Sequence, residues 1–486
     1  MAIRFQRGAL VVVAIGCHGS EPPAHQQAAR PEPTPPQEPT PVPTQPDFPD
    51  GTRSLTLVRT VGVRLEPGDD AKRIGTVAID TRVGWTRTAA GKGCSKNWVE
   101  ISPRGWICGD YVTASKLMPY GQEVPQLDRG EIVPGTYGKV TGPSSVTYLL
   151  EKPKGKPKKP KHDKHPVTSP KDVDDDPKLP HMVENQPLVG SMNVREYDEL
   201  TVGGKLYWKI SHREKDNDYV LASAITKHVP SKWRGARLGD DTGWGVPFAW
   251  VTPRGGGITA WTMVKPNGGG VVRQLAVRTP VPVLETASDA QQHPIAYRVS
   301  DKEWIAAGDV RVFEPAPPPE TLTPGERWID VDLDNQILVA FEGDTPVYST
   351  LVSSGGKDTP TETGIYRIWM KESEADMQGL NGEDPYSVAT VPWTEFFSPE
   401  KGLALHTAYW HDQFGKARSH GCINLAPRDA RWLYFWSDPQ VPPGWTMTAG
   451  VVELPGSIVR VRSKADPNPE TKGYAKKVYE ARLAPK

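Results

Sequence analysis

The stretch that decides the fold is ERWIDVDLDNQILVAFEGDTPVYSTLVSSGG, residues 326–356. Apolar and polar residues alternate along it with a period of two, which is typical of β-strands. The sequence Glu342-Gly343-Asp344 separates two apolar segments and can form the tight turn of a hairpin. We therefore predict a β-hairpin near the start of a β-rich C-terminal domain.

The composition of the whole chain fits several small domains joined by linkers. A chain of 486 residues is long enough for about two to four domains. Its 46 glycines and 50 prolines are too many for a mainly helical protein and favour short strands and turns. The formal net charge of +0 gives no indication of a nucleic-acid partner, and we expect none.

The first 17 residues are typical of an export signal. The apolar run ALVVVAIG (9–16) follows two arginines and is too short to cross a bilayer. The sequence AIGC (14–17) resembles a bacterial lipobox, in which the cysteine, here Cys17, carries the lipid. The alternative is an ordinary cleaved signal peptide that contains a cysteine. Either interpretation predicts an exported protein of the periplasm or cell envelope, and the lipobox adds a lipid anchor to the membrane.

Two segments follow the signal. Residues 18–50 are rich in proline and cannot bury a core, so they are expected to form an extended linker. Residues 51–117 contain short strand candidates separated by Gly, Pro and Asp turns. From Val63 through Trp98 to Ile107, this segment resembles a bacterial SH3-like domain.

Two of the four cysteines of the chain, Cys94 and Cys108, lie within the first SH3-like segment. They are spaced so that a bond between them would close a short loop. In an exported protein we expect a disulfide rather than two free thiols, because the compartment is oxidising.

The middle of the chain repeats the pattern of the first segment more weakly. Residues 118–235 are expected to form a second SH3-like domain, and residues 236–315 a third β module. The second domain is interrupted at 152–180 by a segment dense in lysine, aspartate and proline, which is expected to be disordered. His162 and His165 in this insert could bind a metal ion, but a solvated loop is the favoured interpretation.

Two further segments belong to the C-terminal part. The sequence LAPRDARWLYFWS predicts a short helix that begins near Pro427. Residues 370–392, in contrast, fit neither a strand nor a helix pattern.

The most unusual sequence is KARSHGCINLAP, residues 416–427, which contains Cys422. A metal site would need more ligands at short spacing, and a disulfide would leave one of the other paired cysteines alone. A buried inert thiol and a nucleophile remain. A nucleophile needs a base, and His406 lies at the end of GLALH, a candidate strand.

These residues carry a resemblance. His406, Phe414-Gly415 and SHGCIN (419–424) are similar to the signature of the L,D-transpeptidase catalytic domain, also called the YkuD domain. The similarity covers residues 326–452, which leaves 453–486 as an expected C-terminal tail. Together with the SH3-like resemblance and the strand patterns upstream, it implies a mainly β protein: a C-terminal L,D-transpeptidase-like β-sandwich preceded by two or three small SH3-like β-barrel modules.

The resemblance also implies the roles of the site residues. Cys422 would be the nucleophile and His406 its base, with the imidazole oriented by the backbone carbonyl of Thr407. A neighbouring imidazolium can lower the pKa of a thiol. N–H groups around Gly421 and Cys422 would stabilise the oxyanion. His411 is a rival base, ranked lower because the family base precedes the cysteine by the longer spacing of His406.

Five other residues are given supporting roles. Ser419 and Asn424 are expected to hold the cysteine loop, and His420 to be a scaffold residue that strand geometry turns away. Tyr386 and Trp393 are candidates for contact with substrate, although core packing is the ordinary role of a tryptophan.

The implied reaction is acyl transfer on peptidoglycan stem peptides. Cys422 would attack the carbonyl between the third residue and a terminal D-alanine, and an amine of another stem would resolve the thioester. No cofactor or metal is expected, and the protein is expected to be a monomer. An L,D-carboxypeptidase, in which water resolves the thioester, and a cell-wall-binding protein with an inactive catalytic domain are the alternatives.

Overall fold

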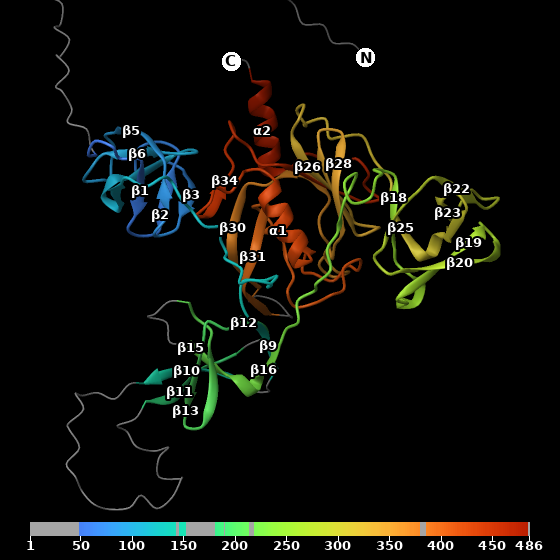
Figure 1. Ribbon diagram of the computed structural model, residues 1–486, viewed down its shortest axis with the longest axis horizontal. Coiled ribbons are helices and arrows are strands. Elements are labelled where there is room, and N and C mark those ends of the chain that lie inside the picture. Colours follow the sequence, from blue (N-terminus) through green and yellow to red (C-terminus); the bar gives the residue numbers. More distant parts are fainter. Residues whose placement is uncertain are drawn as a thin grey trace, which may run out of the picture. The chain divides into compact units, whose positions relative to one another are not determined.

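The computed structural model describes residues 48–141, 145–151, 180–188, 190–212, 218–379 and 385–484. The expected signal with Cys17, nearly all of the Pro-rich linker, and the insert with His162 and His165 lie outside these residues. The mainly β prediction is confirmed, because strands dominate and the described residues contain two α-helices (Figure 1). None of the described helices has the length and apolar character needed to cross a membrane.

The first module consists of two small sheets around a shared apolar core. One sheet has the order β4-β1-β8, and the strands β3-β2-β7-β6-β5 are consecutive in the other. Leu55, Val63 and Ile107 are among the fully buried core residues. Cys94 and Cys108 form a disulfide beside Trp98. The strands are β1 (Ser54–Leu57), β2 (Val61–Arg64), β3 (Arg73–Val77), β4 (Arg82–Val83), β5 (Trp85–Ala89), β6 (Trp98–Ile101), β7 (Trp106–Cys108) and β8 (Val112–Ser115).

The middle module also has two groups of strands. Five form a sheet of order β11-β10-β15-β14-β13, and three follow one another as β16-β9-β12. The second group continues into the C-terminal domain, because β12 pairs with a strand of that domain. The strands are β9 (Tyr137–Val140), β10 (Val146–Glu151), β11 (His181–Pro187), β12 (Ser191–Arg195), β13 (Asp198–Val202), β14 (Lys205–Lys209), β15 (Asp218–Leu221) and β16 (Ile225–Lys227).

The third module contains a three-stranded sheet, β21-β18-β25, and a five-stranded sheet, β20-β19-β24-β23-β22. The short strand β17 (Ala236–Arg237), which lies before them, pairs instead with the C-terminal sheet. The strands of the module are β18 (Phe248–Val251), β19 (Thr259–Lys265), β20 (Gly268–Ala276), β21 (Pro280–Pro282), β22 (Glu285–Ser288), β23 (Pro294–Ser300), β24 (Glu303–Ala306) and β25 (Val310–Phe313).

The C-terminal domain is a β-sandwich with two helices. One sheet has the order β17-β28-β27-β26-β35-β29, and the other contains β30 to β34. Helix α1 packs against β31 (Figure 1) and β32, and helix α2 packs against β29. The elements are β26 (Arg327–Asp332), β27 (Ile337–Glu342), β28 (Thr345–Leu351), β29 (Gly364–Arg367), β30 (Met370–Gly379), β31 (Tyr386–Ser398), β32 (Leu403–Thr407), β33 (Ile423–Leu425), α1 (Pro427–Trp436), β34 (Trp445–Ala449), β35 (Ile458–Arg462) and α2 (Gly473–Leu483).

The predicted hairpin and helix are confirmed. Strands β27 and β28 pair antiparallel around a turn at Gly343, whose φ of 56° suits glycine. Successive side chains of β26 and β27 point to opposite faces of the sheet, and both faces are buried; neither is exposed to solvent. Ile329 and Leu338 face the sandwich core, whereas Trp328 and Val339 pack with residues of the third module.

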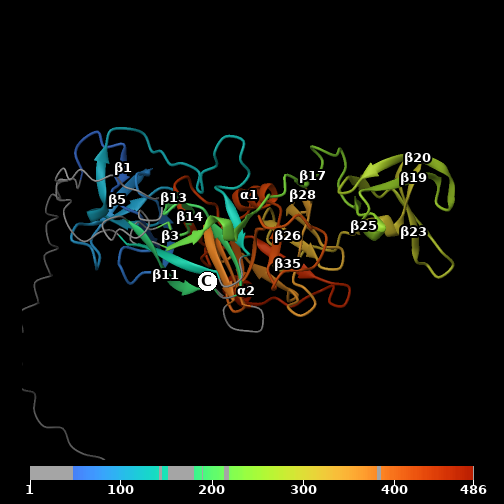
Figure 2. The ribbon, with the colours of Figure 1, turned by 90° about the horizontal axis from the view of Figure 1, so that it is seen from below.

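Two expectations for the C-terminal part are wrong. Residues 370–392 are expected to fit no strand, but 370–379 and 386–392 belong to the long antiparallel pair β30 and β31. The segment 453–486 is expected to be a tail, but it supplies helix α2 and strand β35, which lies beside β26 (Figure 2) and pairs with β29 on its other side. Strand β35 is buried and lies inside the edge strand β29, so the sandwich continues past residue 452.

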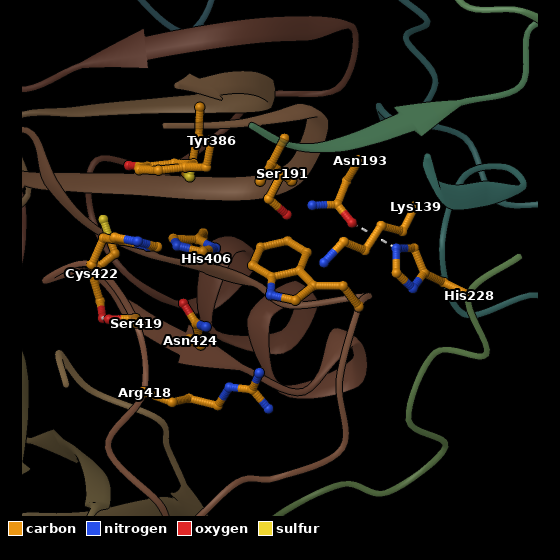
Figure 3. Close-up of a pocket in the computed structure, with 14 residues that line it drawn as sticks. Lys139, Ser191, Asn193, His228, Tyr386, His406, Arg418, Ser419, Cys422 and Asn424 are labelled. Atoms are coloured by element: carbon orange, nitrogen blue, oxygen red, sulfur yellow. Dashed lines mark hydrogen bonds between the residues drawn. The ribbon is translucent and has the colours of Figure 1, made fainter. Parts of the chain in front are cut away.

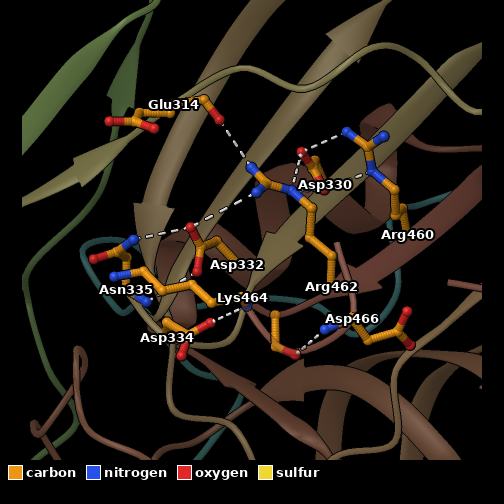
Figure 4. Close-up of polar contacts among 10 residues, drawn as sticks. Glu314, Asp330, Asp332, Asp334, Asn335, Arg460, Arg462, Lys464 and Asp466 are labelled. Atoms are coloured by element: carbon orange, nitrogen blue, oxygen red, sulfur yellow. Dashed lines mark hydrogen bonds and ion pairs between the residues drawn. The ribbon is translucent and has the colours of Figure 1, made fainter. Parts of the chain in front are cut away.

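Strand β35 is tied to β26 by a buried cluster of charges (Figure 4). Parallel pairing sets Asp330 beside Arg460. The fully buried Asp330 carboxylate accepts hydrogen bonds from Arg460 at 2.9 and 2.7 Å and from Arg462 at 3.1 and 3.0 Å. The two guanidinium groups also donate to the backbone carbonyls of Pro317 and Glu314, but Asp330 is the buried counterion that they share.

Replacing Asp330 with Asn should destabilise the protein by about 3–5 kcal/mol, because two largely buried guanidinium groups lose their counterion. Urea unfolding of the full chain, followed by tryptophan fluorescence, measures the change. The control Glu342→Gln alters a partly exposed ion pair between Glu342 on β27 and Arg327 on β26. It should leave the unfolding midpoint almost unchanged. Equal effects of the two substitutions would contradict the importance of the cluster.

Candidate active site

Two adjacent parallel strands bring His406 and Cys422 to one pocket. Strands β32 and β33 pair with Leu405 opposite Ile423 and His406 opposite Asn424, and Cys422 immediately precedes β33. Both side chains line a pocket of about 250 Å³ (Figure 3). The site therefore forms where the chain leaves β32 and returns beside it after fifteen residues, 408–422.

His406 is buried and lines the pocket. Its side chain is 2% exposed, and Nδ1 lies 2.9 Å from the carbonyl oxygen of Thr407. Burial lowers the pKa of His406 to about 4, although the Thr407 carbonyl opposes this shift. At neutral pH the imidazole is uncharged. Its Nδ1–H donates to Thr407, which leaves the Nε2 lone pair as a proton acceptor.

Cys422 is a free, half-buried thiol. Its Sγ donates to the carbonyl oxygen of Gly402 at 3.7 Å, a long contact. Burial raises the pKa of Cys422 to about 11, and a backbone hydrogen bond at Ala404 partly offsets the shift. Both members of the Cys422–His406 pair are thus neutral at rest. The imidazolium that the sequence suggested for lowering the thiol pKa is absent from this state.

The turn before Cys422 is fixed by side-chain hydroxyls. Ser419 Oγ donates to the carbonyl of Cys422 and accepts from the N–H of Gly421 at 3.1 Å. Thr361 Oγ1 donates to the Gly421 carbonyl at 2.6 Å. Gly421 has a φ of 118°, a conformation that favours glycine. Ser419 therefore occupies the Gly421 N–H that the sequence suggested as an oxyanion donor.

His411 is buried next to the site but does not line the pocket. Its ring is 8% exposed, and burial lowers its pKa to about 3, with Arg418 adding to the shift. The Gln413 N–H donates to Nδ1 at 3.1 Å, and the side-chain amide of Asn424 lies 3.1 Å from Nε2. Both ring nitrogens are engaged, and His411 is not among the residues that line the pocket. Asn424 thus holds His411 as well as pairing through its backbone with Ser353.

The two substrate-contact candidates differ in position. Tyr386 lines the pocket and stacks on His420, with ring centroids 4.3 Å apart. His420 therefore also faces the pocket, and the expectation that strand geometry turns it away is wrong. Trp393 is 0% exposed and packs in the sandwich core, so its assignment to substrate contact is wrong.

Eight of the 14 residues that line the pocket were not identified from the sequence. Four lining residues come from the middle module: Lys139, Ser191, Asn193 and His228. Four others, from the C-terminal domain, were not singled out as pocket residues: Met377, Val388, Trp410 and Arg418. No short motif marks them, because pairing between β12 and β31 brings together segments almost 200 residues apart.

Among the described residues, one group of side chains lies close enough together to bind a metal ion: Cys94, Cys108 and Asp110. The two sulfur atoms are bonded to each other, so this cluster does not offer a thiolate pair.

The site geometry agrees with a family match. Residues 326–461 match the L,D-transpeptidase catalytic domain. The match ends within β35, which agrees with the extent of the sandwich. Because it covers a minority of the chain, it concerns this domain and not the three modules before it.

Two curated relatives are similar to this domain. L,D-transpeptidase 2 of Mycobacterium tuberculosis (strain CDC 1551 / Oshkosh) is 31% identical over 120 residues, which is 23% of this chain and 29% of the relative. The protein YciB of Bacillus subtilis (strain 168) is 27% identical over 119 residues, which is 22% of this chain and 59% of the relative. The chain therefore spans less than two thirds of each of these relatives.

Two solved structures are also similar to part of the chain. The catalytic domain of an Enterococcus faecium L,D-transpeptidase is 26% identical, with a TM-score of 0.22, and the match covers 28% of this chain and 98% of that one. The L,D-transpeptidase LdtMt1 in complex with imipenem is 19% identical, with a TM-score of 0.24 and coverage of 37% and 79%.

The raised pKa of Cys422 predicts slow reaction with iodoacetamide at neutral pH. The rate should rise about tenfold per pH unit from pH 7 to 9.5, because the thiolate fraction rises in that proportion below the pKa. Mass spectrometry of the peptide that contains Cys422 follows this thiol alone. A rate that reaches a plateau near pH 7 would show a preformed thiolate and contradict the neutral pair.

Proposed function

We propose that the protein is a peptidoglycan L,D-transpeptidase that acts through a Cys422 thioester. The observation that carries the proposal is the placement of a free thiol and a buried imidazole on adjacent strands in one pocket. The family match of the domain supports the reaction class. The substrate would be a stem tetrapeptide with a terminal D-alanine.

In the first half-reaction, Cys422 Sγ attacks the carbonyl between the third residue and D-alanine. The thiol proton passes to His406 Nε2 as the C–S bond forms, so a thiolate need not exist beforehand. For this transfer, Sγ must leave the Gly402 carbonyl and approach the imidazole. His406 then returns the proton to the leaving nitrogen, and D-alanine departs.

In the second half-reaction, an amine of another stem attacks the thioester carbonyl. His406 takes a proton from the amine, the C–S bond breaks, and the proton returns to sulfur. The products are a new amide cross-link and the original thiol. The oxyanion of each step would be stabilised by the Cys422 N–H, because the Gly421 N–H is held by Ser419.

We also propose that the protein works outside the cytoplasm, as the signal-like N-terminus suggests. The Cys94–Cys108 disulfide supports this location, since such bonds persist in oxidising compartments. Lipid attachment at Cys17 would hold the chain at a membrane.

Purified protein incubated with tetrapeptide muropeptides should release D-alanine and form cross-linked dimers, whereas Cys422→Ala should form neither. Liquid chromatography with mass spectrometry identifies the products, and circular dichroism checks that the variant is folded. Tripeptide without dimer would indicate a carboxypeptidase. Binding without either product would indicate a wall-binding protein with an inactive domain.

A second test separates the two histidines. His406→Ala should lower the rate of Cys422 acylation by a β-lactam by a factor of about 100 or more, the usual contribution of a general base. In the wild type, this rate should fall as the pH drops through about 4, because the base becomes protonated below its lowered pKa. His411→Ala should keep this pH dependence. Loss of the acidic limb in His411→Ala, with its retention in His406→Ala, would reverse the assignment.

A further inference from the structure

One wall of the catalytic pocket is built by the middle module. Strand β12 runs parallel to β31, with Ser191 opposite Tyr386 and Asn193 opposite Val388. Strand β9 pairs with β12 on its other side, and Lys139 lies opposite Asn193. Strands β12 and β9 therefore extend the sheet beyond β31, which carries Tyr386, and their side chains line the same pocket (Figure 3).

Aromatic and charged contacts hold this wall in place. The rings of Tyr137 and Tyr409 stack with centroids 3.9 Å apart, and the Tyr137 hydroxyl donates to the Thr390 carbonyl at 3.3 Å. Arg195 forms an ion pair with Glu374, and their side chains are 17% and 28% exposed. These contacts are mostly buried, so the module is an integral part of the pocket.

The polar groups of this wall are oriented toward the pocket. His228 Nε2 lies 2.7 Å from Asn193 Oδ1. Burial and nearby Lys139 lower the pKa of His228 to about 4, so the neutral ring donates its Nε2–H to Asn193. This contact directs the Asn193 amide nitrogen into the pocket, and the Lys139 ammonium extends beside it toward His406 (Figure 3).

The charges of the pocket favour an anion. Lys139 and Arg418 line it, and none of the 14 described lining residues is an aspartate or a glutamate. In the described part of the chain, Lys139 forms no ion pair. An ammonium and an amide N–H₂ that converge on one space match the two oxygens of a carboxylate.

We propose that Lys139 and Asn193 form a carboxylate-binding subsite of the catalytic pocket, occupied by a carboxylate of the substrate peptide. The identification of the ligand as a peptide rests on the function proposed above. The middle module would then select the substrate as well as cover it. Two sources of the carboxylate are open to test: the terminal D-alanine of the donor and the acceptor stem.

The variants Lys139→Gln and Asn193→Leu remove the two donors, and Lys227→Gln is the matched control. Lys227 lies on β16 next to β9, is 62% exposed and does not line the pocket. For each protein, kcat/KM is measured with a donor tetrapeptide that ends in a carboxylate or in an amide. The same comparison is made with an acceptor whose carboxylates are free or amidated.

The wild type and Lys227→Gln should prefer one carboxylate substrate over its amide by about tenfold, the effect of a charge-assisted hydrogen bond. Lys139→Gln and Asn193→Leu should lose that preference. Its loss in the donor series assigns the carboxylate to D-alanine, and its loss in the acceptor series assigns it to the second stem. A preference that is unchanged in both series would overturn the subsite.

A reaction independent of peptide chemistry tests the charge itself. Cys422 is alkylated in parallel with iodoacetate and iodoacetamide, and the ratio of their rates cancels any change in the thiolate fraction. Lys139→Gln should lower this ratio by about threefold, since one nearby positive charge is lost, while Lys227→Gln should not. An unchanged ratio would overturn the cationic subsite. Absence of peptide products in the wild type would instead overturn the proposed function.

Discussion

The parallel pairing of β32 with β33 is the constraint on which the site depends. It sets His406 against Asn424, so that Cys422, two residues before Asn424, opens onto the same pocket as the imidazole. The intervening chain must leave β32 and return beside it, and buried His411 with Asn424 fixes this return. Strand β31 on the other side of β32 carries the pairing into the rest of the sheet.

The burial that fixes these groups also sets their charge. A dry environment disfavours both imidazolium and thiolate, which explains why the two pKa values move in opposite directions, away from neutrality. The thiol is therefore protected from oxidants that require a thiolate. A bound carbonyl provides the driving force for proton transfer, because the charge that develops passes to the oxyanion and its donors.

Much of this architecture follows from local sequence. Alternation in 326–356 predicts the hairpin, and the SHGCIN motif with His406 predicts the residues at the centre of the pocket. Strand β30 was not predicted from the sequence, because most of its buried side chains are polar. Lys371 is fully buried and pairs with Glu395 at 3.5 Å, so period-two hydrophobicity is lost.

Two other features of the structure were not predicted because they depend on pairing between strands that are distant in the sequence. Strand β35 lies far along the chain from β26, yet it completes the sheet through the charges around Asp330. Likewise, Lys139 and Asn193 reach the pocket because β12 pairs with β31. Neither pairing has a local sequence signal, since each depends on a partner segment more than 100 residues away.

The most direct test of the account is to trap the acyl-enzyme. Wild-type protein is mixed with a tetrapeptide donor without an acceptor, quenched in acid within seconds and digested for mass spectrometry. The account predicts the mass of the tripeptide acyl group on the peptide that contains Cys422, and its removal by hydroxylamine, as for a thioester. Release of D-alanine with no acyl group on Cys422, or with an acyl group on another residue, would contradict it.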